Sequence, residues 1–229
     1  MHAIILAGGK GTRLKPYTIS MPKPLVPLGD KPILERVIID LKSSGFKRIT
    51  LTVNHMAEML IAFFGDGSKW GVKIDYTLEQ EPLSTMGPLH LVKDLPDDFL
   101  VMNGDILTDL NYQEFYDIHK NSSSPFTICS TRRVDTIDYG VLHTRDNELF
   151  KFEEKPKVDF LVSMGIYMAN KRVLDFIPKN TFFGFDHLMH ALLKNKVNVN
   201  VHEYEGYWLD IGRPSDYQKA ITKIEETHE

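Results

Sequence analysis

The sequence predicts an α/β protein whose sheet is mainly parallel, with helices on both faces and an antiparallel insertion. In the first half of the chain, the spacing of apolar residues alternates between the period of a strand and that of a helix. The connections between these segments are short, and strands joined by short crossover helices form parallel sheets. After about residue 125, closely spaced strand patterns follow one another instead, which indicates the antiparallel insertion.

The first half begins with an expected strand at His2–Ala7, a short apolar run that ends at two glycines, as buried strands often do. The apolar residues of 32–44 recur at helical spacing, and Gly45 stands where a helix would end. The following elements are expected in order as a β-branched strand at 48–53, a helix at 57–64, a strand at 72–78, a short helix at 89–95 and a buried strand at 99–102.

The second half is expected to hold the insertion, with turns at Asp146-Asn147 and Lys155-Pro156. Its expected elements are strands at 126–132, 139–144, 149–154 and 161–169, helices at 171–177 and 185–195, a strand at 198–203 and a closing helix at 214–227. The polar run 121–124 is too short for an interdomain linker, and the sequence has no internal repeat. We therefore expect one Rossmann-like mixed domain over residues 1–229.

The composition is that of an ordinary soluble globular protein, with 42% hydrophobic and 25% charged residues among 229. This balance excludes disordered, collagen-like and coiled-coil classes. No apolar stretch approaches the ~20 residues that span a bilayer, and no secretory signal is recognised. We expect a cytoplasmic protein with no membrane partner. The single cysteine, Cys129, excludes an intramolecular disulfide and a cysteine-based zinc site.

The charge is distributed unevenly along the chain. The total is 27 basic against 31 acidic residues, or −4, which argues against a nucleic-acid partner. Residues 1–29, however, contain Lys10, Arg13, Lys15 and Lys23 and no acidic residue, so the remaining 200 residues carry 23 bases and 31 acids. This acid-free segment predicts an anionic ligand near the N-terminus.

A glycine-rich loop, residues 6–16 (Leu-Ala-Gly-Gly-Lys-Gly-Thr-Arg-Leu-Lys-Pro), directly follows the first expected strand. Three glycines in four positions let the backbone adopt positive φ and let a ligand approach the N–H groups, which can form an anion-binding concavity. A simple turn would explain one glycine but not all three. The dinucleotide motif G-x-G-x-x-G is excluded because Leu14 replaces its last glycine, and the Gly-Lys-Ser/Thr of a P-loop is missing.

The loop, together with Pro22-Lys-Pro24, closely resembles the signature of the sugar-1-phosphate nucleotidylyltransferases, or nucleotide-sugar pyrophosphorylases. The similarity continues along nearly the whole chain, through residues 79–88, 103–105, 153–156 and 208–212. Segments 81–83, 87–89 and 207–212 look most like mannose-1-phosphate guanylyltransferases. The resemblance implies the nucleotide-diphospho-sugar transferase fold, with a nucleotide-binding part at about 1–120 and a sugar-phosphate-binding part at about 121–229.

The resemblance implies that a nucleoside triphosphate, with GTP favoured, is joined to a sugar-1-phosphate and that pyrophosphate is released. Arg13 and Lys23 would be catalytic. The guanidinium of Arg13 suits phosphate oxygens and would offset charge on the α-phosphate and the departing pyrophosphate. Lys23, between two prolines, would lie near the α-phosphate. The nucleotide would be bound by Leu6, Ala7, Gly8, Gly9, Gly11, Thr12, Arg13, Glu79, Pro82, Thr85, Gly87, Asn103 and Gly104.

By the same resemblance, Asp105 and Asp210 would hold Mg²⁺, a hard cation that prefers oxygen ligands. From the residues alone, Asp105 reads as a turn residue and Asp210 as a capped or paired carboxylate. The sugar phosphate would be bound by Tyr139, Gly140, Glu154, Lys155, Ser163 and Gly165. Because Ser163 stands where the family often has Asn, a manno-configured heptose-1-phosphate is an alternative to mannose-1-phosphate.

Three alternatives remain open from the sequence. One is a uridylyl- or thymidylyltransferase acting on another sugar phosphate. A second is a glycosyltransferase, although its Asp-x-Asp metal motif is missing, since Asp105 is followed by Ile106-Leu107. The third is a non-catalytic regulator that binds nucleotide sugars. The oligomeric state is open too, with a homodimer as one arrangement.

Overall fold

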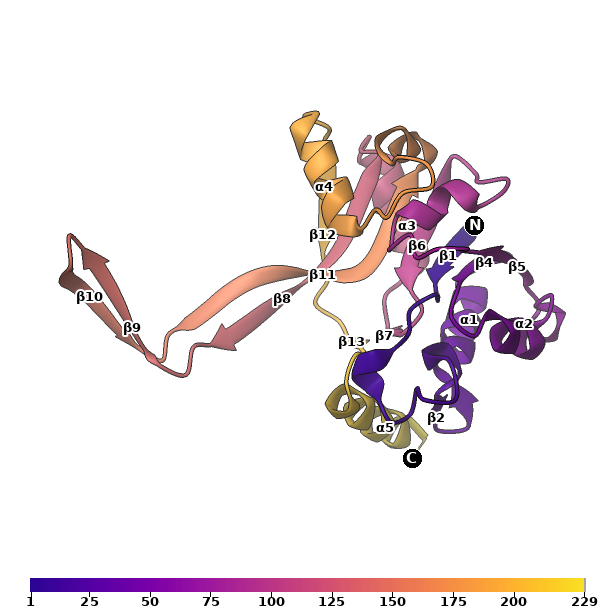
Figure 1. Cartoon of the computed structure of the whole chain (residues 1–229), viewed down its shortest axis with the longest axis horizontal. Helices are drawn as coiled ribbons and strands as arrows, with labels where there is room; N and C mark the ends of the chain where they lie inside the picture. The colour runs from indigo at the N-terminus through magenta and orange to yellow at the C-terminus, as the bar shows by residue number, and fades with distance from the viewer. Residues whose placement is uncertain (229) are drawn as a thin grey trace.

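A seven-stranded mixed sheet forms the centre of the computed structural model, which describes residues 1–228 (Figure 1). The strand order is β12-β8-β11-β6-β1-β4-β5. The bounds are His2–Leu6 for β1, Arg48–Val53 for β4, Lys73–Leu78 for β5, Asp98–Asn103 for β6, Phe126–Thr136 for β8, Lys157–Asn170 for β11 and Val199–Glu203 for β12. Strand β11 runs antiparallel to both neighbours, and the other pairs are parallel. The predicted fold class is confirmed.

Helices cover both faces of this sheet. Their bounds are Ile33–Ser43 for α1, Ala57–Phe64 for α2, Tyr112–Asn121 for α3 and Phe185–Lys194 for α4, while a further helix, α5 (Pro214–His228), packs away from the sheet. Successive side chains of a strand point to opposite faces, so Ile4 and Ile5 of β1 enter different hydrophobic clusters. The cluster of Ile5 includes residues of α1, α2 and α3, whereas that of Ile4 includes Leu188 and Leu192 of α4.

The C-terminal helix α5 packs against the N-terminal segment. A third cluster joins Tyr217 and Ala220 of α5 to Leu14, near the end of the glycine-rich loop, and to Val26 after it. The Tyr217 hydroxyl donates a 2.6 Å hydrogen bond to the carbonyl oxygen of Pro27. The two ends of the chain therefore jointly fix the segment that follows the glycine loop.

Several short elements differ from the sequence prediction. The expected helices at 89–95 and 171–177 are 3₁₀ helices, at Gly87–Leu91 (η4) and Lys171–Phe176 (η5). Prolines follow positions 95 and 177, and a residue before proline is disfavoured in the α region. Helix α3 was not predicted, nor were the strands β2 (Pro27–Leu28), β3 (Lys31–Pro32), β7 (Ile106–Thr108) and β13 (Trp208–Asp210). Three further 3₁₀ turns are η1 (Thr12–Leu14), η2 (Lys23–Leu25) and η3 (Ser68–Trp70).

The antiparallel insertion forms an arm that stands clear of the rest of the molecule (Figure 1). Strands β8 and β11 extend beyond the sheet, further than predicted, and lead into a hairpin of β9 (Gly140–Arg145) and β10 (Glu148–Glu154). Its turn is at Asp146-Asn147 as predicted, with both residues at positive φ (49° and 66°). We call residues 131–162 the arm and the remainder the body.

Two further features concern the single cysteine and the character of the helices. Burial raises the pKa of the Cys129 thiol, in β8, to about 12, so this cysteine is unreactive near neutral pH. Within residues 1–228, no helix combines the length and the apolar character needed to cross a membrane.

The buried histidine His2 predicts a loss of stability in mild acid. Burial, with a smaller effect of the Arg48 charge, lowers the pKa of His2 to about 4. Between pH ~6.5 and 4 the unfolded chain binds a proton that the folded chain does not. The contribution of His2 to the unfolding free energy therefore has its full value above pH ~6.5, and the unfolding free energy falls by about 3 kcal/mol as the pH drops to 4. Urea unfolding at pH 7, 6 and 5 measures this loss.

A His2→Gln variant is the control for this prediction. The pKa of buried His119 is lowered as well, so the variant retains part of the pH dependence. An equal slope of unfolding free energy against pH in the variant and the wild type would show that His2 does not contribute.

Candidate active site

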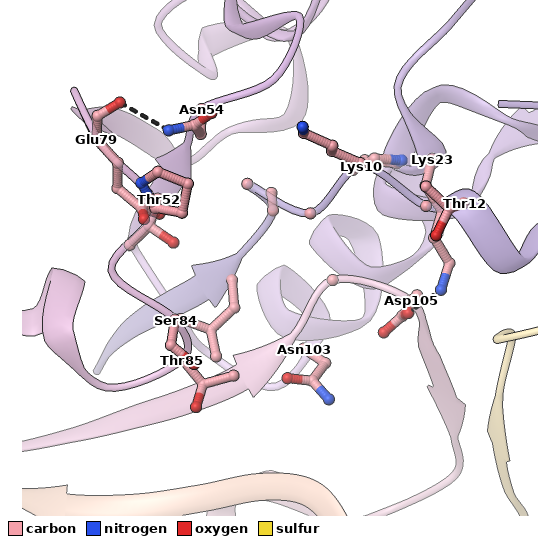
Figure 2. Close-up of a pocket in the computed structure, with 18 of the residues that line it drawn as sticks. Lys10, Thr12, Lys23, Thr52, Asn54, Glu79, Ser84, Thr85, Asn103 and Asp105 are labelled. Carbon is pink, nitrogen blue, oxygen red and sulfur yellow. Dashed lines mark hydrogen bonds and ion pairs between the residues drawn. The ribbon is translucent and has the colours of Figure 1, made fainter. Parts of the chain in front are cut away.

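A cavity of about 530 Å³ opens at the carboxyl ends of β1, β4 and β6 (Figure 2). Leu6, the last residue of β1, pairs with Thr52 of β4 on one side and with Asn103 of β6 on the other. These residues line the cavity because parallel strands end at the same edge of a sheet, where open α/β proteins bind ligands. The volume is in the range typical of small-molecule sites.

The glycine loop forms one wall of the cavity, and two of its glycines have different structural reasons. Gly11 has a left-handed backbone (φ 60°), and a Cβ there would lie 3.0 Å from the Lys23 Cβ. The Thr18 hydroxyl holds this turn by donating a 2.8 Å hydrogen bond to the Gly11 carbonyl. Gly9 also lines the cavity, but a Cβ there would meet no atom within 4 Å. Gly11 is thus required by the fold, whereas Gly9 leaves room for a ligand.

Three cationic side chains line the same side of the cavity: Lys10, Arg13 and Lys23 (Figure 2 labels the two lysines). The guanidinium of Arg13 lies flat against Gly212, with its carbon and both terminal nitrogens 3.7 Å from the position of a Cβ there. Arg13 makes no hydrogen bond or ion pair within residues 1–228. Its five donors are therefore available to an anion in the cavity.

Lys23 is engaged in a different way. Its ammonium group donates to Asp105 Oδ2, in an ion pair whose side chains are only 12% and 20% exposed. Because both groups are largely buried, each stabilises the charge of the other. The pair fixes the Lys23 ammonium beside the carboxylate at the end of β6.

Two carboxylates from distant parts of the sequence meet beside this ion pair. Strand β7 pairs with β13, which places Asp210 opposite Ile106, and the Ile211 N–H donates a 3.0 Å bond to the Asp105 carbonyl. Burial, followed by the charge of Asp105, raises the pKa of Asp210, while Lys23 and Arg13 oppose this shift. A concentration of negative charge at a buried position results.

The two carboxylates fit a divalent cation. The Oδ1 atoms of Asp105 and Asp210 are both buried and have no hydrogen-bond partner in the described chain. Buried carboxylate oxygens are normally paired, so two such oxygens at neighbouring positions need positive charge. Residues 1–228 contain no group of three or more His, Cys, Asp or Glu side chains arranged for a metal. Mg²⁺, which is commonly held by one or two carboxylates plus substrate phosphate, suits a pair of this kind.

The opposite wall is formed by the segment around residues 79–85. Glu79 Oε2 accepts a 2.9 Å hydrogen bond from the Leu83 N–H, which closes the loop, and burial raises the pKa of Glu79. The Asn54 amide donates to the Glu79 carbonyl at 2.9 Å, the contact dashed in Figure 2. Thr85 accepts a 2.8 Å bond from the Phe185 N–H. This wall is thus anchored to β4 and α4 while its Pro82, Ser84 and Thr85 line the cavity.

Comparison with known proteins identifies the family of the chain. Residues 2–227 match the family described as Nucleotidyl transferase. The chain belongs to the nucleotidyl transferase family. It is 36% identical to mannose-1-phosphate guanyltransferase of Debaryomyces hansenii, in a match that covers 95% of this chain and 62% of that protein. It is 38% identical to probable mannose-1-phosphate guanylyltransferase 1 of Oryza sativa subsp. japonica, covering 95% and 63%. The chain thus spans less than two thirds of these relatives.

A solved structure covers the whole fold of this nucleotidyl transferase. HddC from Yersinia pseudotuberculosis is 30% identical, with a TM-score of 0.77 and coverage of 97% of this chain and 99% of that one. The same protein complexed with GMP-PN gives 29% identity and a TM-score of 0.75. These matches confirm both the family resemblance carried by the glycine loop and the fold class predicted from the apolar pattern.

The nucleotidyl transferase cavity gathers most of the residues expected to bind a nucleotide. Those lining it are Leu6, Ala7, Gly8, Gly9, Gly11, Thr12, Arg13, Glu79, Pro82, Thr85, Asn103 and Gly104. Lys23, expected to be catalytic, and Asp105, expected to hold the cation, line it too, whereas Asp210 is not among the lining residues. Gly87 is not among the lining residues. It is buried behind the wall, where its N–H donates a 2.9 Å bond to the Phe183 carbonyl, and a Cβ there would lie 2.7 Å from the Thr181 carbonyl oxygen. Gly87 thus packs the wall from behind.

Other lining residues were missing from the predicted site. These are Lys10, Pro24, Thr52, Asn54, Ser84, Phe182 and Gly212. Thr52 and Asn54 could have been found because they lie at the carboxyl end of the strand beside β1. Ser84 and Phe182 come from irregular segments without a motif, and only the folded chain brings them to the cavity.

The residues expected to bind the sugar phosphate lie in two places, none of them in the cavity lining. Ser163 and Gly165 are at the base of the arm, where a Cβ on Gly165 would lie 2.6 Å from Asn103 Nδ2. The other four gather on the arm, where Gly140 pairs with Glu154 and the Lys155 N–H donates to the Tyr139 carbonyl at 3.3 Å. Figure 1 shows this hairpin far from the body. The sugar-phosphate role of all six stays a prediction.

Proposed function

We propose that this protein is a sugar-1-phosphate nucleotidylyltransferase, which makes a nucleoside diphosphate sugar and pyrophosphate. The observation that carries the proposal is the meeting, in one cavity wall, of an open glycine loop, the uncommitted guanidinium of Arg13 and the carboxylate of Asp105, with the Asp210 carboxylate beside Asp105 at the edge of the cavity. Two polyanions can be brought within bonding distance only where cations and oriented amides offset their repulsion. Membership of the nucleotidyl transferase family supports the same activity.

The reaction is a direct displacement at phosphorus. An oxygen of the sugar-1-phosphate forms a bond to the α-phosphorus of the triphosphate, and the bond from that phosphorus to the β-phosphate oxygen breaks. Pyrophosphate leaves with the electron pair. The attacking phosphate is already ionised near neutral pH, so no side chain has to remove a proton. Positioning and charge stabilisation therefore account for catalysis.

The chain's own residues divide this work. The N–H groups of the glycine loop and Arg13 bind the triphosphate, and Arg13 offsets the charge that develops on the departing pyrophosphate. Lys23, held by its ion pair with Asp105, lies next to the α-phosphate. Asp105 and Asp210 would hold Mg²⁺, which when bound neutralises phosphate charge.

The substrate pair is proposed from the relatives and from one residue of the chain. The related mannose-1-phosphate guanyltransferases, and the structure of HddC with GMP-PN, favour GTP. The same relatives favour mannose-1-phosphate. The short side chain of Ser163, bonded to the Tyr167 hydroxyl at 3.0 Å, keeps a manno-configured heptose-1-phosphate as the second candidate. We propose a cytoplasmic enzyme, because its triphosphate substrate is made there.

Pyrophosphate release from a matrix of four triphosphates against mannose-, heptose- and glucose-1-phosphate tests the proposal. We expect release in the GTP wells with a manno-configured sugar. Release only with UTP or dTTP would correct the base but keep the reaction. No release in any well, with nucleotide still bound, would favour a non-catalytic regulator instead.

Two glycine variants distinguish a glycine that leaves room for the ligand from a glycine that the fold requires. Gly9→Ala is expected to leave the unfolding free energy within about 0.5 kcal/mol of wild type, because its Cβ meets no protein atom. The added methyl occupies ligand space, so GTP affinity should fall at least about tenfold, or 1.4 kcal/mol. Gly11→Ala, the matched control, should instead lower the unfolding free energy by about 1–2 kcal/mol because of its left-handed backbone. Calorimetric GTP titration and urea unfolding measure the two effects. Unchanged GTP affinity in Gly9→Ala would remove the loop from the nucleotide site.

A further inference from the structure

The arm exposes an unusual amount of apolar surface for a segment without a partner. Ten of its large apolar side chains are between 38% and 78% exposed: Val134, Ile137, Tyr139, Leu142, Leu149, Phe150, Phe152, Val158, Phe160 and Leu161. Large exposed apolar patches on soluble proteins mark surfaces that bind a partner.

Both faces of the arm share this character. The β8–β11 register places Val134 and Leu161 on one face and Val158 and Phe160 on the other. In the hairpin, Leu142 lies opposite Phe152, on the same face as Leu149. A ribbon only two strands wide has no core of its own and is marginally stable in water. The arm therefore needs cover from another surface.

The body of the same chain is poorly placed to give that cover. Every residue of β8 from Phe126 to Thr136 pairs with β11, so β8 is paired along its whole length from the sheet into the arm. Strand β11 has a register shift between Ser163 and Ile166, but this irregularity is fixed: the Trp208 indole donates to the Met164 carbonyl at 2.9 Å, and the Gly165 N–H donates to Ser163 Oγ at 3.2 Å. Folding the arm back over its own cavity would break these bonds.

The cavity and the arm each hold what the other lacks. The predicted triphosphate and cation residues line or adjoin the cavity, whereas Tyr139, Gly140, Glu154 and Lys155, predicted for the sugar phosphate, are on the arm. The reaction requires both substrates within bonding distance. The charges of the two parts are complementary, which favours contact between them. Residues 1–29 carry four bases and no acid, while residues 138–155 carry five acids and three bases.

We propose that two copies of this chain exchange arms, so that the arm of each copy covers the cavity of the other and contributes the sugar-phosphate residues in trans. The 16 residues from Thr131 to Asp146 reach roughly 50 Å when extended, beyond the about 16 Å radius of gyration of a 200-residue body. In a two-fold dimer, each arm is covered by the partner's body and each cavity receives the partner's sugar-phosphate residues. This inference rests on the proposed function, whose sugar-phosphate residues it places across the interface.

Sedimentation is the first test. Wild type should have twice the mass of one chain, and Leu142→Glu/Leu149→Glu should sediment as a monomer and lose pyrophosphate release together with dimerisation. Leu193→Glu is the matched control, since Leu193 is 68% exposed on α4 of the body. It should remain a fully active dimer. An active wild-type monomer would overturn the proposal.

A mixed dimer provides the decisive test. Arg13→Ala removes a cavity residue and Lys155→Ala an arm residue; both side chains are exposed, so both variants should fold, as circular dichroism verifies. Each variant alone should be nearly inactive. In a hybrid isolated with two affinity tags, one cavity and the arm covering it are both intact, so about half of the wild-type activity should return. An inactive hybrid, with active wild type, would show that each arm serves its own cavity.

Cross-linking separates this inference from the proposed function. Tyr139→Cys and Ser84→Cys chains are mixed and treated with a short bis-maleimide, to which the buried Cys129 is inert. Arm exchange predicts a band of two chains that needs both variants and disappears when Leu142→Glu/Leu149→Glu is added to the Tyr139→Cys chain. Formation of this band by the two cysteine variants, together with a wild type that releases no pyrophosphate, would refute the function and keep the exchange. Failure to form it would refute the exchange whatever the activity.

Discussion

Arg13→Ala is expected to slow pyrophosphate release about 10³-fold, with little change in folding. A guanidinium that stabilises charge on a transferring phosphoryl group contributes about 10³–10⁵ in kcat in related chemistry, and a single oxyanion donor about 10²–10³. The side chain is exposed and makes no hydrogen bond or ion pair with residues 1–228, so its removal leaves no protein group unpaired. The rate of pyrophosphate release and the midpoint of urea unfolding measure the two parts of this expectation.

Two further variants make the Arg13 prediction specific. Lys15→Ala removes an equal charge two residues away, from a side chain that does not line the cavity, and should keep the rate within about threefold of wild type. Arg13→Lys keeps the charge but not the planar fork, so it should recover only part of the loss. Equal losses in Arg13→Ala and Lys15→Ala would mean that general positive charge, and not the position of Arg13, promotes the reaction.

The central strands and the helices α1, α2, α4 and α5 could be predicted because each has a periodic apolar pattern long enough to identify it. Helix α3 was missed although its capping signal is visible. The Asn111 side chain caps it by accepting from the N–H groups of Gln113 and Glu114, and Asn is a preferred N-cap residue. Strands β7 and β13 have three residues each, too few for any period, and they pair across about a hundred positions of sequence.

The candidate site could also be predicted only where local sequence determines the structure. Residues of the glycine loop and the ends of β1 and β6 were predicted because local sequence determines both the turn and the edge of the sheet where it lies. That Asp105 and Asp210 are neighbours depends on the β7–β13 ladder, which local sequence does not indicate. The position of the arm was unpredictable for another reason. Its strand pattern indicates pairing but not how far β8 and β11 continue past the sheet, which tertiary contacts determine.

Asp105→Asn and Asp210→Asn are expected to reduce activity alike but to change stability in opposite directions. Losing a cation ligand at the phosphates should cost several kcal/mol of transition-state stabilisation, or about 10³-fold in rate. Asp210→Asn also removes a buried charge beside Asp105, so the unfolding free energy should rise by roughly 0.5–2 kcal/mol. Asp105→Asn leaves the 12%-exposed Lys23 without its partner, and the unfolding free energy should fall by about 2 kcal/mol.

The cation itself is tested with the same proteins. Chelation with EDTA should abolish pyrophosphate release by the wild type, and added Mg²⁺ should restore it. In thermal unfolding with GTP, Mg²⁺ should raise the midpoint of wild type but not that of either Asn variant, which is a readout independent of turnover. Asp117→Asn, at an exposed carboxylate of α3, is the control and should match wild type throughout. Because Asp210→Asn is expected to be the more stable protein, its inactivity cannot be attributed to unfolding. Near wild-type turnover in that variant would therefore exclude Asp210 from the cation site.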